Sequence, residues 1–290
     1  MKNIIILISV YNDWESLKKL IDEINLIIKD FKDFHFDCLI INDASTIKKP
    51  QLIKPSNINK LEILNMQENR GHARCNAFGI RYVFQNKRFD NLIVMDGDGE
   101  DRPIEIKSLV NKIINEPTVS VVAKRVQRSE GLFFQFLYQA HKLITFIFTG
   151  KNINFGNYSI LTKEAVEKLQ NKSSLWSSFS GTLKKNVIPL NNISSIRGIR
   201  YYGPSKMSLF KLLIHSLSII AVFKYQVFLR SSFIIILLGY LNFLMGNFSI
   251  TLQILVVTFN LMIFIVSLRE KEKELLNSHE NLKDKESIVH

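Results

Sequence analysis

The chain has few of the residues that build disulfide frameworks or zinc centres. Its 290 residues include only two cysteines, Cys38 and Cys75, in apolar or helical contexts, and six scattered histidines. Such spacing gives neither a disulfide framework nor a metal-ligand pattern, so a zinc site is disfavoured. The apolar start, residues 3–10, is too short for a signal peptide and runs into a polar segment. We therefore expect the N-terminal part to lie in the reducing cytoplasm.

Three common catalytic or nucleotide-binding motifs are also missing. GxGxxG does not follow the first apolar segment and GxxxxGK does not occur, which disfavours a Rossmann dehydrogenase and a P-loop enzyme. Ser45 lacks the glycines of a nucleophile elbow, so no Ser-His-Asp arrangement stands out. Any catalytic chemistry must therefore depend on another set of polar residues.

Charge is absent from one long segment. From Ser231 to Leu268 the sequence has no charged residue and no histidine, and Gly246 and Asn247 interrupt it near the middle. One spanning helix needs about 20 apolar residues, so this length predicts a transmembrane hairpin with helices near 231–245 and 248–268. Basic residues flank both outer ends, which predicts cytoplasmic termini. A buried helical pair of a soluble protein is the alternative.

The segments beside this hairpin have different compositions. Residues 207–230 are apolar with sparse basic residues, as in amphipathic juxtamembrane helices, although helices packed on a domain show the same pattern. Residues 269–290 form a charged cytoplasmic tail, which we expect to begin as a short helix and end in disorder. The basic surplus behind the net charge of +12 lies before residue 231 and suits nucleic acid, anionic lipid or phosphorylated substrates equally.

Strand and helix patterns alternate through the N-terminal part of the chain. The expected strands are residues 3–10, 36–42, 60–66, 91–95 and 118–124, and the expected helices are residues 12–31, 71–85 and 103–114. Asn12 and Glu15 have the spacing of a capping box, and Pro103 suits the first turn of the third helix. This alternation predicts an α/β domain with a mostly parallel sheet, whose ligands bind beyond the carboxyl ends of the strands.

Acidic residues crowd one such strand end. The segment DGDGED, residues 96–101, follows the apolar run 91–95, and its glycines permit a tight turn. Carboxylates this close repel one another unless a cation lies among them. Asp96 and Asp98 are spaced to hold Mg²⁺ or Mn²⁺ together with substrate phosphates, and the ion would neutralise a diphosphate leaving group. Taken alone, however, an acidic turn is more often a solvated loop.

Several motifs occur in an order that is typical of one enzyme family. They are VYNDWESLKKLI, LIINDAS, NRGHARCNAFGI, VMDGDGEDRPIEI and RYYGPSK. In this order they resemble family 2 glycosyltransferases of the GT-A fold. More narrowly they resemble the polyprenyl-phosphate glycosyltransferases, which include dolichyl-phosphate mannose synthase and bactoprenol glucosyltransferases. The resemblance runs from Ile4 to Arg230 and implies a GT-A domain over residues 1–206.

The resemblance also implies a function. It predicts an inverting, multi-pass enzyme of the cytoplasmic membrane that moves a sugar from a UDP- or GDP-sugar to polyprenyl phosphate for cell-envelope biogenesis. Mg²⁺ or Mn²⁺ would be the cofactor and nucleic acid no partner, and a homo-oligomer stays open. One hairpin without a QxxRW motif disfavours a processive polymer synthase. Two alternatives remain: the same fold with a saccharide hydroxyl acceptor, and a non-catalytic, nucleotide-binding membrane scaffold.

Family roles fall on particular residues of the donor side. The acidic residue that closes the second strand, here Asp43, would recognise the nucleotide base, unless Asn42 and Asp43 only form an Asx turn. The donor- and cofactor-binding set is Tyr11, Asp43, Asn69, Gly71 and Asp96. The metal-binding set is Asp96, Asp98 and Glu100. His72 is a further donor-pocket candidate, although a lone histidine near a helix start often caps or packs.

Basic residues would meet the acceptor, because guanidinium groups match phosphate oxygens in geometry. The implied catalytic residues are Asp98, Arg125 and Arg128. The implied acceptor-phosphate set is Arg125, Arg128, Arg200, Ser205 and Lys206. A basic face turned toward an anionic membrane would explain the same residues.

Two positions depart from the family pattern. Asn157 stands where many relatives have an aspartate, and the aspartate that usually follows the serine of NDAS is absent. An amide cannot act as a general base. Because a lipid phosphate is already ionised at neutral pH, Asn157 is compatible with that acceptor. A saccharide hydroxyl would need a base, and we would expect Asp101 or Glu100 to supply it.

Overall fold

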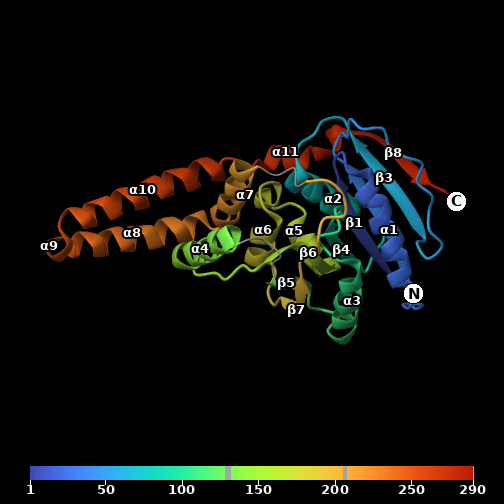
Figure 1. Ribbon diagram of the computed structural model, residues 1–290, viewed down its shortest axis with the longest axis horizontal. Coiled ribbons are helices and arrows are strands. Elements are labelled where there is room, and N and C mark those ends of the chain that lie inside the picture. The colour runs from blue at the N-terminus through green and yellow to red at the C-terminus, as the bar shows by residue number, and fades with distance from the viewer. Residues whose placement is uncertain (128–131, 205–207, 290) are drawn as a thin grey trace.

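The structure is a computed structural model that describes residues 1–127, 132–204 and 208–289 (Figure 1). Within these residues, eight strands form one sheet in the order β7-β5-β6-β4-β1-β2-β3-β8. The strands are β1 (Lys2–Val10), β2 (Phe34–Asn42), β3 (Lys60–Met66), β4 (Asn91–Asp96), β5 (Val121–Gln127), β6 (Phe155–Thr162), β7 (Asn191–Ile196) and β8 (Leu282–Ile288).

The sheet is mixed but mostly parallel. β1 pairs in parallel with β2 and β4, β2 with β3, and β5 with β7. β6 is antiparallel to both β4 and β5, and β8 is antiparallel to β3. The predicted α/β class is therefore confirmed, and the five predicted strands correspond to β1 through β5. β6, β7 and β8 were not predicted.

Helices cover the two faces of the sheet. The α-helices are α1 (Trp14–Ile28), α2 (His72–Asn86), α3 (Ile106–Asn115), α4 (Leu132–Thr149), α5 (Lys163–Leu169), α6 (Phe179–Asn186), α7 (Leu209–Ala221), α8 (Lys224–Tyr240), α9 (Asn242–Met245), α10 (Asn247–Ser267) and α11 (Glu272–Leu276). Short 3₁₀ helices span Pro103–Glu105, Ser173–Trp176 and Ser278–Asn281.

The central strand β1 is buried on both sides, as expected of a parallel sheet between helix layers. Ile5 and Leu7 pack in the core cluster that includes α2, α5 and α6, whereas Ile4, Ile6 and Ile8 pack in the cluster that includes α1 and α3. The alternating residues of one apolar run therefore join both halves of the core. This burial fixes the carboxyl ends of β1, β2 and β4 at one edge of the sheet.

The predicted capping box at the start of α1 is wrong. Asp13 is the N-cap and makes no side-chain cap bond, while Asn12 has a φ of 51°. The Asn12 Oδ1 accepts hydrogen bonds from the amides of Thr46 (2.7 Å) and Ile47 (3.0 Å). Asparagine tolerates the left-handed region, which aims its side chain across to the loop after β2. Asn12 therefore joins the loops that follow β1 and β2.

Two antiparallel helices project from the domain as an arm, formed by α8 and α10 with α9 at its tip (Figure 1). The chain turns at Gly246, where φ is 55°, and α10 begins at Asn247. α8 begins at Lys224 and therefore runs through the expected border between residues 230 and 231. α4 packs at the base of the arm, where the Arg230 Nη1 donates to the Ile147 carbonyl over 3.1 Å. No helix was predicted for the residues of α4.

The segment after the arm is ordered, so the expected disorder of the tail is wrong. The short helix is present as α11, and β8 then pairs antiparallel with β3, with Leu61 opposite Ile288 and Asn65 opposite Asp284. Leu282 and Ile288 pack against the core. β8 gives β3 a hydrogen-bonding partner, and its own outer edge carries charged side chains, as sheet edges commonly do.

Glu62 of β3 makes an electrostatic contact with the tail. Its carboxylate pairs with Lys87 and, at 3.0 Å, with the Lys285 Nζ of β8, and the side chain is 13% exposed. Burial opposes its ionisation, but the hydrogen bonds from the two lysines outweigh burial and lower the pKa of Glu62 below 4.5. Such a group stabilises the fold above its unfolded pKa, and this contribution is lost as the pH falls through the folded pKa.

We therefore expect Glu62→Gln to lower the stability of the purified protein at pH 7 by about 1 kcal/mol. The difference from wild type should persist from pH 5 to 8 and shrink below about pH 4, because protonated Glu62 no longer attracts the lysines. Thermal unfolding across this pH range measures it, with the exposed Glu15→Gln as the control. Equal unfolding temperatures at every pH would show that the lysine pairs add no net stability.

Candidate active site

The acidic loop after β4 is closed by its own carboxylates. The Asp101 Oδ2 accepts a hydrogen bond from the Asp96 amide over 3.0 Å, and the Asp98 Oδ1 accepts one from the Glu100 amide over 3.1 Å. Asp101 is buried, and the following 3₁₀ helix has Arg102 as its N-cap without a side-chain cap bond. Asp101 therefore stabilises the loop and does not cap the next helix.

A second segment, residues 197–201, lies along the acidic loop. The Gly198 amide donates to the Glu100 carbonyl (2.8 Å) and the Tyr201 amide to the Asp98 carbonyl (3.0 Å). A Cβ on Gly198 would lie 2.6 Å from the Gly99 carbonyl oxygen, so only glycine permits this approach. The pairing brings the arginines of this segment to the carboxylates of the loop.

Those arginines neutralise two of the carboxylates. The Arg200 Nη1 lies 2.8 Å from the Asp98 Oδ2, and the same guanidinium pairs with Asp13. Arg197 pairs with Glu100. Arg200 was predicted to meet an acceptor phosphate, whereas here it contacts a predicted metal ligand. Arg197 and Asp13 were missed, although two arginines in RGIRYY could have indicated partners for an acidic loop.

Asp96 has polar partners from α2 and β6. The His72 Nε2 lies 3.1 Å from the Asp96 Oδ1, and the Asn157 Nδ2 donates to the same oxygen over 3.1 Å. The His72 Nδ1 lies 2.7 Å from the Ser9 Oγ of β1, which sets the orientation of the ring. A carboxylate at position 157 would have no proton to donate. The amide of Asn157 therefore gives Asp96 a hydrogen bond that the usual family aspartate would not give.

The crowding of carboxylates alters their pKa values. Burial, followed by the charges of Asp96 and Glu100, raises the pKa of Asp98 to about 6. Burial, followed by the charge of Asp96, raises the pKa of Asp101 to about 7. Burial also opposes ionisation of Asp96, but His72 and then Asn157 outweigh it and lower its pKa below the ordinary value. A cation at the loop would favour the ionised form of all three carboxylates.

The donor atoms of the loop suit Mg²⁺ or Mn²⁺, which prefer carboxylate oxygens and water. In the described part of the chain, no three His, Cys, Asp or Glu side chains are arranged to hold a metal ion. The arginine pairs explain this, because Asp98 and Glu100 are turned to Arg200 and Arg197. Ligation by Asp98 would require it to exchange Arg200 for the ion.

On the donor side, Asp43 is buried at the end of β2. Its two carboxylate oxygens accept hydrogen bonds from the amides of Arg70 and Gly71, each over 2.9 Å. Asn42 makes the local turn instead, because its Oδ1 accepts from the Ser45 amide over 3.0 Å. Asp43 therefore fixes the loop before α2, and base recognition by Asp43 stays a prediction. Tyr11 and Asn69 are exposed beyond the strand ends.

The predicted acceptor residues are only partly described. Arg125, at the end of β5, is largely buried, and its Nη2 lies 3.7 Å from the Asp101 Oδ1. The structure therefore brings Arg125 and Arg200 to the acidic loop. Arg128, Ser205 and Lys206 lie outside the described residues, so their predicted roles stay predictions.

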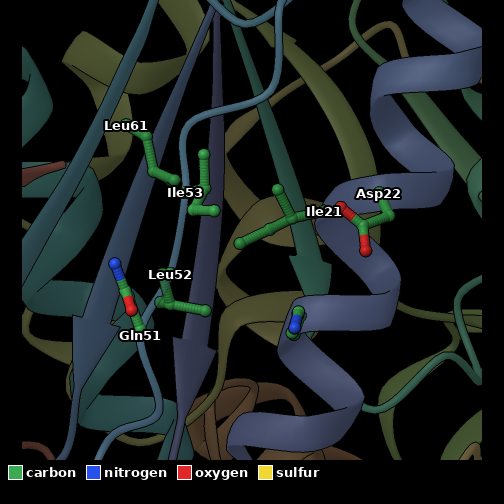
Figure 2. Close-up of a pocket in the computed structure, with 7 residues that line it drawn as sticks. Ile21, Asp22, Gln51, Leu52, Ile53 and Leu61 are labelled. Atoms are coloured by element: carbon green, nitrogen blue, oxygen red, sulfur yellow. The ribbon is translucent and has the colours of Figure 1, made fainter. Parts of the chain in front are cut away.

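Two of the cavities in the described part of the chain lie on opposite faces of the sheet near β3. One, of about 150 Å³, lies between α1 and the segment before β3 and includes none of the predicted site residues. Figure 2 shows its walls, with Ile21 and Asp22 from α1 and Gln51, Leu52 and Ile53 from that segment. The other, of about 10 Å³, is lined by Asp43, Arg70, Arg74, Cys75, Trp176, Ser278 and Asn281, among others. Residues of the tail therefore lie beside Asp43.

Known proteins are similar to parts of this chain. An uncharacterised protein of Methanocaldococcus jannaschii is 23% identical over 113 residues, which cover 38% of this chain and 46% of that protein, less than half its length. Glucosyl-3-phosphoglycerate synthase from Mycobacterium tuberculosis, solved with Mn²⁺, UDP and glucosyl-3-phosphoglycerate, has 12% identity and a TM-score of 0.49 over 78% of this chain and 80% of that chain. A mannosyltransferase from Pyrobaculum calidifontis, solved with GDP-Man and Mn²⁺, has 13% identity and a TM-score of 0.47 over 92% and 87%.

A family model places the chain more firmly. The model described as "Glycosyl transferase family 2" matches residues 5–179, which is more than half of the chain and includes most of β1 and all of β2 through β6. This match confirms the enzyme class implied by the resemblance, and the mixed, mostly parallel sheet with helices on both faces agrees with it. The chain belongs to glycosyl transferase family 2.

Proposed function

We propose that this glycosyltransferase moves one sugar from a nucleotide sugar to polyprenyl phosphate at the cytoplasmic face of a membrane. The observation that carries the proposal is the arm of α8, α9 and α10, an apolar structure attached to the domain that holds the acidic loop. Its large side chains are exposed along its length; Tyr240 is 83% and Phe243 95% exposed. Soluble proteins rarely expose so much apolar surface, whereas a lipid acceptor requires access to a bilayer.

The dimensions of the arm support insertion into a bilayer. The 21 residues of α10 give a helix about 30 Å long, close to the thickness of the hydrocarbon core. By length and composition, the helical stretch Asn247–Leu276 is able to cross a membrane, and α7 and α8, bent by 86°, pass the same test together as a second span. Two crossings suit an antiparallel hairpin.

The return of the chain to the sheet supports two crossings. β8 follows the arm and pairs with β3, while β1 and β2 of the same sheet precede the arm. The segments before and after the arm must therefore lie on the same side of any membrane that the arm enters. A single crossing would separate β8 from β3. Basic residues at the base of the arm, Lys224 and Arg230, favour the cytoplasmic side.

Helices α4 and α7 extend the apolar surface at the base of the arm. Their exposed large side chains are Phe136, Leu137, Leu143, Ile144, Phe146 and Ile147 on α4, and Leu209, Phe210 and Leu213 on α7. Helices with one exposed apolar face and nearby lysines are typical of the headgroup region. This surface would bring the acceptor phosphate near the domain that carries the acidic loop.

The site residues suit a phosphate acceptor. A phosphate oxygen would attack the anomeric carbon in line, the bond from that carbon to the diphosphate would break, and the nucleoside diphosphate would leave with the bonding electrons. A divalent cation held by Asp96 and Asp98 would neutralise the diphosphate. Arg200, released from Asp98, would be free to bind phosphate oxygens. Asn157 takes no proton, and an ionised phosphate needs none removed.

The main test combines purified protein in detergent with undecaprenyl phosphate, Mg²⁺ or Mn²⁺ and a panel of radiolabelled nucleotide sugars. We expect one donor to label the organic phase only with metal. Asp98→Asn should reduce the rate at least about 100-fold, because it weakens the binding of the cation that would neutralise the diphosphate. Asp30→Asn, which affects an exposed aspartate paired with Lys107, should leave transfer unchanged.

Other results would favour the alternatives. Transfer to a saccharide but not to lipid would indicate a hydroxyl acceptor, and loss of that transfer in Asp101→Asn would identify its base. If no nucleotide sugar binds in the presence of metal, catalysis as proposed is wrong.

The orientation of the arm is testable by cysteine labelling, because Cys38 and Cys75 are both buried. Asn247→Cys places a thiol at the exposed tip of the arm, and Lys283→Cys places one on the exposed side of β8. In spheroplasts, an impermeant thiol reagent should label Asn247→Cys at once and Lys283→Cys only after permeabilisation. If both variants need permeabilisation, the arm does not cross the membrane.

A further inference from the structure

The loop that joins β3 to α2 is bound by the tail. Asn281, in the 3₁₀ helix before β8, is 3% exposed. Its Oδ1 accepts a hydrogen bond from the Glu68 amide and its Nδ2 donates to the Glu68 carbonyl, each over 3.0 Å. Its own carbonyl accepts from the Gln67 amide over 2.8 Å. One buried side chain thus satisfies both main-chain groups of Glu68.

The other end of the same loop is bound by Asp43, through the amides of Arg70 and Gly71. Gly71 has a φ of 89° and is the N-cap of α2, so its conformation is one that other residues rarely adopt. Between these two buried side chains lies Asn69, which is exposed. Asn281 and Asp43 together therefore fix the backbone on both sides of Asn69.

The contacts of Asn281 go beyond what strand pairing needs. β8 pairs with β3 only as far as Met66, and Glu68 lies past the end of that ladder. A strand alone would leave Glu68 to solvent, yet the tail places a buried amide side chain against it. Asn281 also lines the small cavity beside Asp43. These contacts act on the loop that carries Asn69 and Gly71 rather than on the sheet.

We propose that Asn281 is a positioning residue for the nucleotide-sugar donor, and that residues 278–282 form part of the donor side of the site. This inference rests on the proposed function and on the donor-binding set implied by the family resemblance, which includes Asn69 and Gly71. Asn281 does not touch the reacting atoms; it acts by holding the backbone of Glu68. Loss of its two side-chain hydrogen bonds would let the loop sample other conformations, so donor binding would carry a larger ordering cost.

The test compares full-length variants in detergent. Asn281→Ala removes both side-chain hydrogen bonds, and Asn281→Asp keeps an acceptor for the Glu68 amide but loses the donor. In Asn281→Ala we expect both the Kd for the nucleotide, measured with Mn²⁺, and the KM for the donor to rise about 10-fold. The rise should be smaller in Asn281→Asp, and kcat should change by less than about threefold in either variant. Asn277→Ala, an exposed asparagine of the same tail, should behave as wild type.

Hydrogen exchange supplies a readout that does not need the donor. In Asn281→Ala, the amides of Glu68, Arg70 and Gly71 should exchange faster, while those in the centre of β1 should keep their wild-type protection. Unchanged exchange in the loop would overturn the inference, even if no donor were found to bind. Wild-type donor affinity in Asn281→Ala would overturn it too, as would a fall in kcat with an unchanged KM. Failure of the wild-type protein to bind any donor would instead count against the proposed function.

Discussion

The crowding of carboxylates after β4 is the constraint on which the site depends. Side chains of like charge this close are stable only when each has a compensating partner. The partners come from separate parts of the chain: His72 and Asn157 for Asp96, Arg200 for Asp98, Arg197 for Glu100, and Arg125 with the Asp96 amide for Asp101. α2, β5, β6 and the segment 197–201 therefore converge on one loop of six residues.

The pairing of Asp98 with Arg200 also leaves a way for a divalent cation to take the place of the arginine. Asp98 is paired with a guanidinium that has a second carboxylate partner, Asp13. If a divalent cation replaces Arg200 at Asp98, the arginine keeps Asp13 and stays within the site. The same positive charge would then face the phosphates that accompany the ion. The observed role of Arg200 is to pair with Asp98 and Asp13, and its contact with an acceptor phosphate stays a prediction.

The sequence predicted the central part of the fold because that part depends on local apolar patterns. β1 through β5 and α1 through α3 follow continuous apolar runs or helical periods, and the carboxylates at the end of β4 were visible as a cluster. β7, with the sequence NNISSI, and β8, with alternating charges, lack such patterns because they are held by backbone pairing at the sheet margins. The left-handed conformation of Asn12 likewise has no sequence signal that separates it from a cap.

The individual partners at the site were harder to predict for the same reason. Asn157 could be recognised as a departure from the family, but its hydrogen bond to Asp96 depends on how β6 packs against β4. Asn281 lies in a charged tail whose composition predicted disorder. Its contact with Glu68 forms only when β8 has paired with β3.

The tail also connects the arm to the loop before α2. The Glu270 carboxylate, directly after α10, lies 2.8 Å from the Lys224 Nζ at the start of α8, so the two helices are joined at their base. From there, Glu274 accepts a hydrogen bond from the Trp176 Nε1 over 3.0 Å, and Asn281 binds Glu68. The loop before α2 is therefore completed only when the chain has passed through the arm and returned. In this arrangement, the position of the arm and the conformation of the loop before α2 depend on the same segment of the chain.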